Sequence, residues 1–114
     1  DAGITVVAPA GDHLGSEPTD ACSVTPAMVR SAITVGAAED HTRMPSSNIG
    51  ACVDIFAQGS WPCAGSLSDY STSEAKGTSP AAAHVTGLAA TILGKEPGLK
   101  PDEVLKRIIG QSEP

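Results

Sequence analysis

Apolar residues in this chain gather in short runs separated by turn-rich polar stretches. Residues 4–8, Ile-Thr-Val-Val-Ala, form a β-branched run without strict alternation. Such a run suits a strand that is buried on both faces of a parallel sheet. Residues 52–57, Cys-Val-Asp-Ile-Phe-Ala, predict another short strand, whereas the polar residues 58–76 predict a long loop.

Two helices are expected in the C-terminal part of the chain. Residues 79–93 are almost wholly apolar, which predicts a buried helix that ends near Gly94. Gly87 lies inside it and costs about 1 kcal/mol relative to Ala, which suggests close packing on a neighbour. A second helix is predicted to begin at Pro101, with acidic residues in its first turn, and to stop near Gly110.

Strand and helix patterns together indicate the later part of one α/β domain covering residues 1–114. The chain opens almost directly into a strand pattern, so we expect it to begin within a longer protein. Three aromatic residues among 40% hydrophobic ones predict a core of Ala, Val, Ile and Leu. The net charge of −6 argues against nucleic acid or an anionic membrane as partner.

Ser79 is the candidate catalytic residue that the local pattern supports. A Ser/Thr-rich stretch leads into Gly77, and Pro80 then favours the first helical position. Ser79 would therefore lie at a helix N-terminus, where free N–H groups favour negative charge. A serine held there is a candidate nucleophile whose own N–H can face an oxyanion. The alternative is that Thr78 and Ser79 only cap the helix.

The stretch from Gly77 to Gly87 reads Gly-Thr-Ser-Pro-Ala-Ala-Ala-His-Val-Thr-Gly. It resembles the Gly-Thr-Ser-x-Ala-x-x-His-Val-x-Gly motif around the nucleophile of subtilisin-like serine proteases. Residues 32–37, which end in Val-Gly-Ala, and residues 47–50, Ser-Asn-Ile-Gly, are also similar to family segments. The resemblance runs from residue 4 to about residue 109, and looks closest to the proteinase K branch and its secreted convertase-like members. It implies a three-layer α/β subtilisin-like fold with a mostly parallel sheet, of which only the C-terminal part is present.

The resemblance also assigns roles around Ser79. It implies that Ser79 is the nucleophile and that small residues wall the pocket for the substrate side chain, namely Ala8, Pro9, Ala10 and Gly11. Asp12 stands where the family has an Asn that donates to the oxyanion. An ionised Asp only accepts hydrogen bonds, although a protonated one could donate, and a simple turn role is the alternative.

The general base is missing from this stretch. In subtilisin-like enzymes the chain order is Asp, His, Ser, so both partners would lie before residue 1. His84 is five residues beyond Ser79, roughly 140° around the helix, so we expect it to be structural. The 114 residues alone are therefore expected to be inactive.

Two functions remain open at this stage. The first is a serine endopeptidase, secreted and acting on peptide or protein substrates, that needs no cofactor for its chemistry. The second is a protease-like fold that binds a partner protein, which Asp12 and Pro80 favour. Pro80 stands where the family most often has Met, and it disfavours helical backbone at Ser79. A truncated product that does not fold alone is a third reading.

The three cysteines allow one pair and one leftover, or no pair. Some secreted convertase-like members have cysteines at places that match Cys22 and Cys52. The resemblance therefore implies a disulfide between these two, with Cys63 unpaired. Two buried free thiols are the alternative.

A structural calcium site is a further expectation from the resemblance. The proteinase K branch binds calcium through an Asp side chain and two backbone carbonyls. Those positions correspond here to Asp54, Arg30 and Ala32. Hard oxygen ligands suit Ca²⁺. The alternative is that Asp54 caps a turn.

Overall fold

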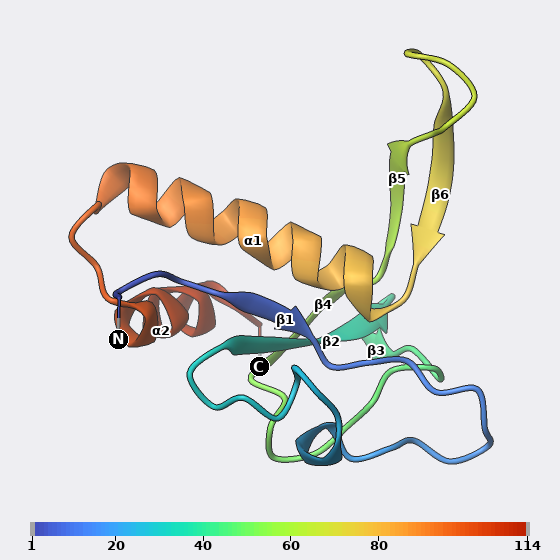
Figure 1. Cartoon of the computed structure of the whole chain (residues 1–114), viewed down its shortest axis with the longest axis horizontal. Coiled ribbons are helices and arrows are strands. Elements are labelled where there is room, and N and C mark those ends of the chain that lie inside the picture. The colour runs from blue at the N-terminus through green and yellow to red at the C-terminus, as the bar shows by residue number, and fades with distance from the viewer. Residues whose placement is uncertain (1, 114) are drawn as a thin grey trace.

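A short parallel sheet forms the centre of the computed structural model, which describes residues 2–113. Its strands lie in the order β1–β2–β4, where β1 is Val7–Pro9, β2 is Ile33–Glu39 and β4 is Ile55–Gln58. The two-residue strand β3, Thr42–Arg43, pairs antiparallel with the end of β2. The parallel sheet that the family resemblance implies is therefore present (Figure 1).

The middle strand, β2, is buried on both faces. Ile33, Val35 and Ala37 point to one face and contribute to the main hydrophobic core. Thr34 points to the other face, where its hydroxyl donates to the carbonyl of Ala27 at 2.9 Å. A buried hydroxyl with a partner avoids the cost of an unsatisfied polar group.

Both long helices pack on one face of the sheet. Helix α1, Thr78–Lys95, lies across β1, β2 and β4, and α2, Pro101–Gln111, packs against α1 (Figure 1). Both helices share one hydrophobic core with the sheet, to which α1 contributes Val85 and α2 contributes Val104 and Ile108. Neither helix, within residues 2–113, has the length and apolarity that a membrane crossing needs.

Loops cover the opposite face of the sheet and complete three layers. A short 3₁₀ helix, Ala21–Ser23, belongs to this layer. Ala10, Ala27 and Cys52 are buried there with Ala21 in a second, smaller cluster. A disulfide joins Cys22 to Cys52, the two cysteines that the resemblance pairs, with a Cα–Cα distance of 5.2 Å. Cys63 is free and exposed.

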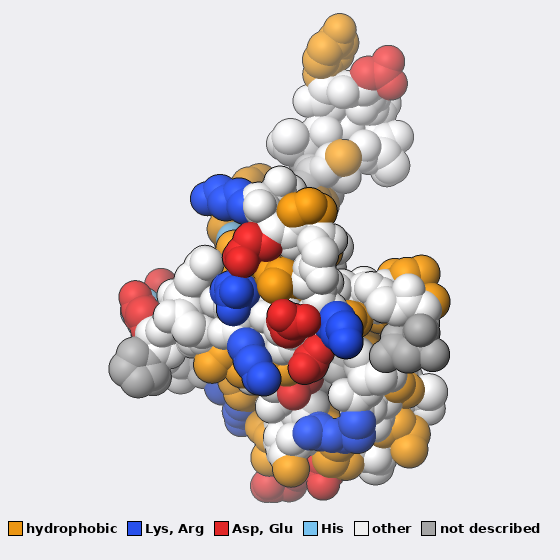
Figure 2. Space-filling view, turned by 90° about the vertical axis from the view of Figure 1, so that its left-hand side faces the viewer, with side chains coloured by type: hydrophobic (Ala, Val, Ile, Leu, Met, Phe, Trp, Pro, Cys, Tyr) orange, Lys and Arg blue, Asp and Glu red, His pale blue; other side chains and the backbone are white. Residues whose placement is uncertain are grey.

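Residues 58–76 differ from the predicted loop. They contain an antiparallel hairpin of β5, Ser60–Ala64, and β6, Thr72–Lys76, in which Trp61 pairs with Ala75. The hairpin projects from the body of the protein (Figures 1 and 2). It helps to explain a radius of gyration of 14.4 Å, above the roughly 13 Å of a compact domain of this length.

Two burial predictions were wrong. The run at residues 4–8 is not buried on both faces, because Ile4 is 69% and Val6 is 54% exposed. Among the described strands β1 pairs with β2 alone, so it forms a sheet edge. Helix α1 buries only one side, and no atom outside the helix would touch a Cβ added at Gly87 within 4 Å.

Candidate active site

Ser79 is exposed at the start of α1, in its second helical position. The helix begins at Thr78, one residue earlier than predicted, and Pro80 is its third residue rather than its first. Pro80 still costs no intrahelical bond there, because the first four N–H groups of a helix lack such partners. Ser79 is helical in spite of the following proline, so Pro80 does not displace it from helical backbone.

Thr78 is completely buried and joins the start of α1 to the turn after β1. Its hydroxyl accepts the Gly11 N–H at 3.2 Å and donates to Asp12 Oδ2 at 2.8 Å. The Thr78 N–H donates to both oxygens of Asp12 at 3.2 Å. Asp12 also accepts from the hydroxyl of Ser46 at 3.2 Å. The motif places Thr78 beside Ser79, the candidate nucleophile, but no local signal in the sequence predicts its contacts with residues 66 and 67 positions away.

The four residues expected to wall the substrate pocket lie at the end of β1. Ala8 is 3% and Ala10 is 0% exposed, whereas Pro9 and Gly11 are half-buried. Gly11 has a φ of 99° and its N–H donates to the Thr78 hydroxyl, so the structure brings this turn to the start of α1. The turn that follows β1 therefore lies against Thr78, the residue before Ser79.

The partner of the His84 side chain is Trp61 of the hairpin, rather than Ser79. Its ring stacks on Trp61 of β5, with centroids 4.7 Å apart and planes 16° apart. The Trp61 indole N–H donates to the carbonyl of Gln58 at 2.7 Å, which fixes the ring. This stack attaches the hairpin to α1, and the sequence did not reveal it because the two residues come from separate elements.

Charges near the helix start are exposed. The Nζ of Lys76, just before Gly77, lies 3.7 Å from Oε1 of Glu74 in the same strand, and both side chains are exposed. The hydroxyl of Ser60 donates to Glu74 at 2.7 Å, and this bond, with the nearby Lys76, lowers the pKa of Glu74 below its ordinary value. Both charges belong to the hairpin that leads directly into α1.

The residues expected to bind calcium lie around the start of β2. Asp54 Oδ2 accepts the Thr34 N–H at 2.8 Å, and the Asp54 N–H donates to the Thr34 carbonyl at 2.9 Å. Arg30 directs its guanidinium to the Ala51 carbonyl at 3.2 Å. Asp54, just before β4, is therefore paired with Thr34, which is two residues beyond Ala32 in the sequence, and its other carboxylate oxygen has no hydrogen bond to a described residue. No three His, Cys, Asp or Glu residues cluster in the described chain, but a site built from carbonyls does not require such a cluster.

Known proteins share both the sequence and the fold of this chain. The model of the subtilase family matches residues 1–113. An extracellular serine proteinase from Thermus sp. (strain Rt41A) is 41% identical over 99% of this chain and 27% of its own length. The subtilase-type proteinase psp3 from Schizosaccharomyces pombe (strain 972 / ATCC 24843) is 45% identical over 75% of this chain and 19% of its own length.

A solved structure of a cold adapted subtilisin-like serine proteinase superposes with a TM-score of 0.81 at 38% identity. It covers 91% of this chain, while the chain covers 37% of it. The chain thus spans well under half the length of these relatives. The matching family model and the shared fold agree with the motif around Ser79, and the chain belongs to the subtilase family.

Proposed function

We propose that this chain is part of a subtilisin-like serine endopeptidase of the proteinase K type, with Ser79 as its nucleophile. The observation that carries the proposal is the exposed Ser79 at the first turn of α1, beside the end of β1. Helix N-termini favour developing negative charge, which an acyl-transfer reaction places near the nucleophile.

The reaction proceeds through an acyl-enzyme. Ser79 Oγ attacks the carbonyl carbon of a peptide bond while a His takes its proton. The tetrahedral intermediate collapses, the C–N bond breaks, and the proton passes to the leaving amine. Water then hydrolyses the ester. The His and the Asp that orients it come from outside these 114 residues, and no cofactor takes part.

The substrate is a peptide or protein whose side chain enters the pocket at Ala8, Pro9, Ala10 and Gly11. The net charge of −6 argues against nucleic acid or an anionic membrane as a partner. Secretion is part of the proposal, supported by the Cys22–Cys52 disulfide and by a relative named extracellular.

A fluorophosphonate probe tests the proposal. Ser79 Oγ bonds to phosphorus as fluoride leaves, and the base takes the Ser79 proton. We expect labelling of the complete protein and none of its Ser79→Ala variant. The 114-residue chain should stay unlabelled, because without the His the hydroxyl is a poor nucleophile near neutral pH. Absence of Ser79-dependent labelling in the complete protein would refute the endopeptidase.

Asp12 supports a second function, a protease-like fold that binds a partner protein. An ionised carboxylate at this position opposes an oxyanion, and losing one oxyanion donor costs about 2.7–4 kcal/mol of transition-state stabilisation. A complete protein that folds, stays unlabelled and retains a protein ligand on affinity chromatography would favour this function.

A structural calcium ion is also proposed, held by the side chain of Asp54 and the carbonyls of Arg30 and Ala32. Its role would be to tie the start of β2 to the segment before β4. We expect calcium to raise the melting temperature of the complete protein and Asp54→Asn to reduce that rise. The hairpin-tip variant Asp69→Asn is the matched control. An unchanged melting temperature with excess calcium or with chelator would count against the site.

A further inference from the structure

The carboxylate of Asp12 is engaged by donors from two segments. The N–H and hydroxyl of Thr78 and the hydroxyl of Ser46 all donate to it. In every one of these bonds the Asp12 carboxylate is the acceptor, which is the role that carboxylate oxygens take. Hydrogen bonds to a charged acceptor are stronger than neutral ones.

Asp12 supplies the cap that α1 lacks locally. The N-cap residue is Gly77, which has no side chain to accept the first helical N–H groups. Asp12 accepts the N–H of Thr78, the first helical residue, from 66 positions earlier in the chain. Its negative charge also lies at the positive end of the helix dipole.

The backbone around this contact is closely packed and hydrogen-bonded. A Cβ added at Gly77 would lie 3.0 Å from both carboxylate oxygens of Asp12, so the carboxylate lies directly against this glycine. The N–H of Gly77 donates to the Gly59 carbonyl at 2.8 Å. Thr78 is 0% exposed. The start of α1 is therefore held by the β1 turn on one side and by Gly59 on the other.

We propose that Asp12 is a positioning residue that anchors Thr78, and with it the adjacent Ser79, to the end of β1. Asp12 uses its carboxylate as an acceptor here and does not supply an oxyanion donor. The effect on catalysis rests on the proposed function of Ser79, whereas the anchor itself is a property of folding. The two parts are therefore tested separately.

A double-mutant cycle in the complete protein tests the anchor. Loss of a helix cap should lower the folded-to-unfolded ratio of Asp12→Ala about 2- to 30-fold. The double variant Asp12→Ala/Thr78→Val should lose at least about twofold less of this ratio than the product of the two single-variant losses predicts. The reason is that either substitution alone already removes the 2.8 Å bond between the two side chains. Asp69→Ala, which removes an exposed carboxylate at the hairpin tip, should combine multiplicatively with Thr78→Val. Multiplicative losses for Asp12 and Thr78 as well would overturn the anchor.

Hydrogen exchange provides a measurement that needs no reversible unfolding. The Thr78 amide should exchange faster in Asp12→Ala than in wild type, by a similar 2- to 30-fold factor at about the same pH. Asp12→Asn keeps an acceptor oxygen and should retain most of the protection. An equally protected amide in Asp12→Ala would contradict the proposal.

Labelling of Ser79 by the fluorophosphonate then tests positioning. Folded Asp12→Ala should label at least about tenfold more slowly than wild type, because misplacing a reacting group by about 1 Å can cost a hundredfold. Asp12→Asn should label at least as fast as wild type. Wild-type labelling in folded Asp12→Ala would overturn the positioning role. If no variant labels, the proposed function fails, and the cycle and the exchange data still decide the anchor.

Discussion

Gly77 adopts a backbone conformation that few other residues tolerate, immediately before the helix that carries Ser79. Its φ is 120°, and the nearest atoms to an added Cβ would be the oxygens of Asp12 at 3.0 Å. A side chain here would strain the backbone and press on the carboxylate together. The glycine of the motif is thus required by conformation and by space.

We expect Gly77→Ala to destabilise the protein by about 1–3 kcal/mol, because Ala disfavours this φ. Gly110→Ala is the matched control, since Gly110 lies in α2 with no atom within 4 Å of an added Cβ. Gly110→Ala should stabilise the protein by about 0.5–1 kcal/mol, because Gly is less favourable than Ala inside a helix. Urea unfolding of the three proteins measures both effects. Equal stability of Gly77→Ala and wild type would contradict the conformational argument.

At the scale of residues, the sequence motif located Ser79 but not its supports. The Gly-Thr-Ser pattern is local, so it could be recognised without a structure. The bonds from Asp12 to Thr78 join positions 66 residues apart, and no periodicity carries that information. The residue pattern predicts that Asp12 either faces an oxyanion or sits in a turn, and it does not predict that Asp12 accepts a hydrogen bond from the first N–H of α1.

At the scale of elements, the helices and the strands β1 and β4 followed approximately from apolar runs and β2 from its similarity to a family segment, whereas the hairpin was not predicted. Strand β6, Thr-Ser-Glu-Ala-Lys, has little apolar character and resembles a loop in sequence. It becomes a strand through its antiparallel pairing with β5 and the Ser60–Glu74 hydrogen bond. The one-sided burial of α1 was also missed, since its small residues look apolar on every side.

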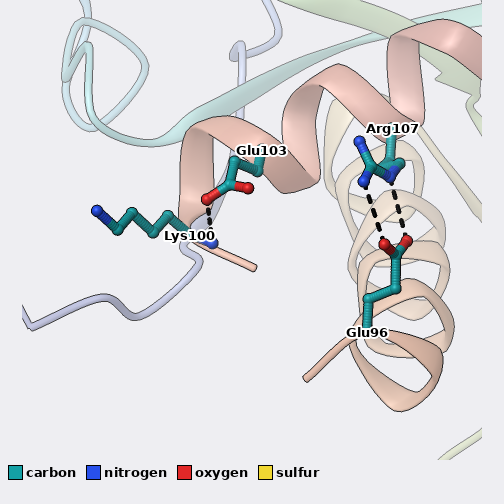
Figure 3. A network of polar contacts seen from close by, with 4 residues as sticks. All are labelled: Glu96, Lys100, Glu103 and Arg107. Carbon is teal, nitrogen blue, oxygen red and sulfur yellow. Dashed lines mark hydrogen bonds and ion pairs between the residues drawn. The ribbon is translucent and has the colours of Figure 1, made fainter. Parts of the chain in front are cut away.

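An exposed ion pair connects the end of α1 to α2. Arg107 donates two hydrogen bonds of 3.1 Å to Glu96, while Glu103 accepts the Lys100 N–H at 3.2 Å within the first turn of α2 (Figure 3). The bonds from Arg107 lower the pKa of Glu96, and the carboxylate raises the pKa of Arg107. The face that carries these helices shows acidic and basic side chains intermixed (Figure 2).

This pair should stabilise the fold only where Glu96 is ionised. Because the pKa of Glu96 is lowered by folding, its contribution is complete above the ordinary Glu pKa and is lost as pH falls through the folded value. Arg107→Gln should therefore lower the melting temperature slightly at pH 7 and not at about pH 2, where the carboxyl is protonated. Lys106→Gln, a neighbouring exposed cation without an ion-pair partner in the described chain, is the control. A loss that is equal at both pH values would argue against the pair.

At the scale of the whole molecule, the chain exposes more surface than a compact domain of its mass. Its accessible area is 7076 Å², compared with roughly 5,800 Å² expected. The projecting hairpin contributes to this excess, because most of its residues are exposed. Apolar tip residues Leu67 and Tyr70 are 93% and 94% exposed. With so much uncovered surface, local constraints such as the disulfide matter more to stability.

The disulfide is expected to be the largest single covalent constraint on the loop layer. It closes a separation of 30 residues, for which the chain-entropy relation gives about 3.5 kcal/mol. The Cys22→Ala/Cys52→Ala protein should therefore lose roughly 3.5 kcal/mol of unfolding free energy, and the buried cluster around Ala10 and Ala27 should loosen. Cys63→Ala, at a free and exposed cysteine, should leave stability almost unchanged. Denaturant unfolding of the oxidised protein and both variants measures these differences, and reduction of wild type should reproduce the double variant. If the double variant unfolds at the same denaturant concentration as Cys63→Ala, the bond does not constrain this layer.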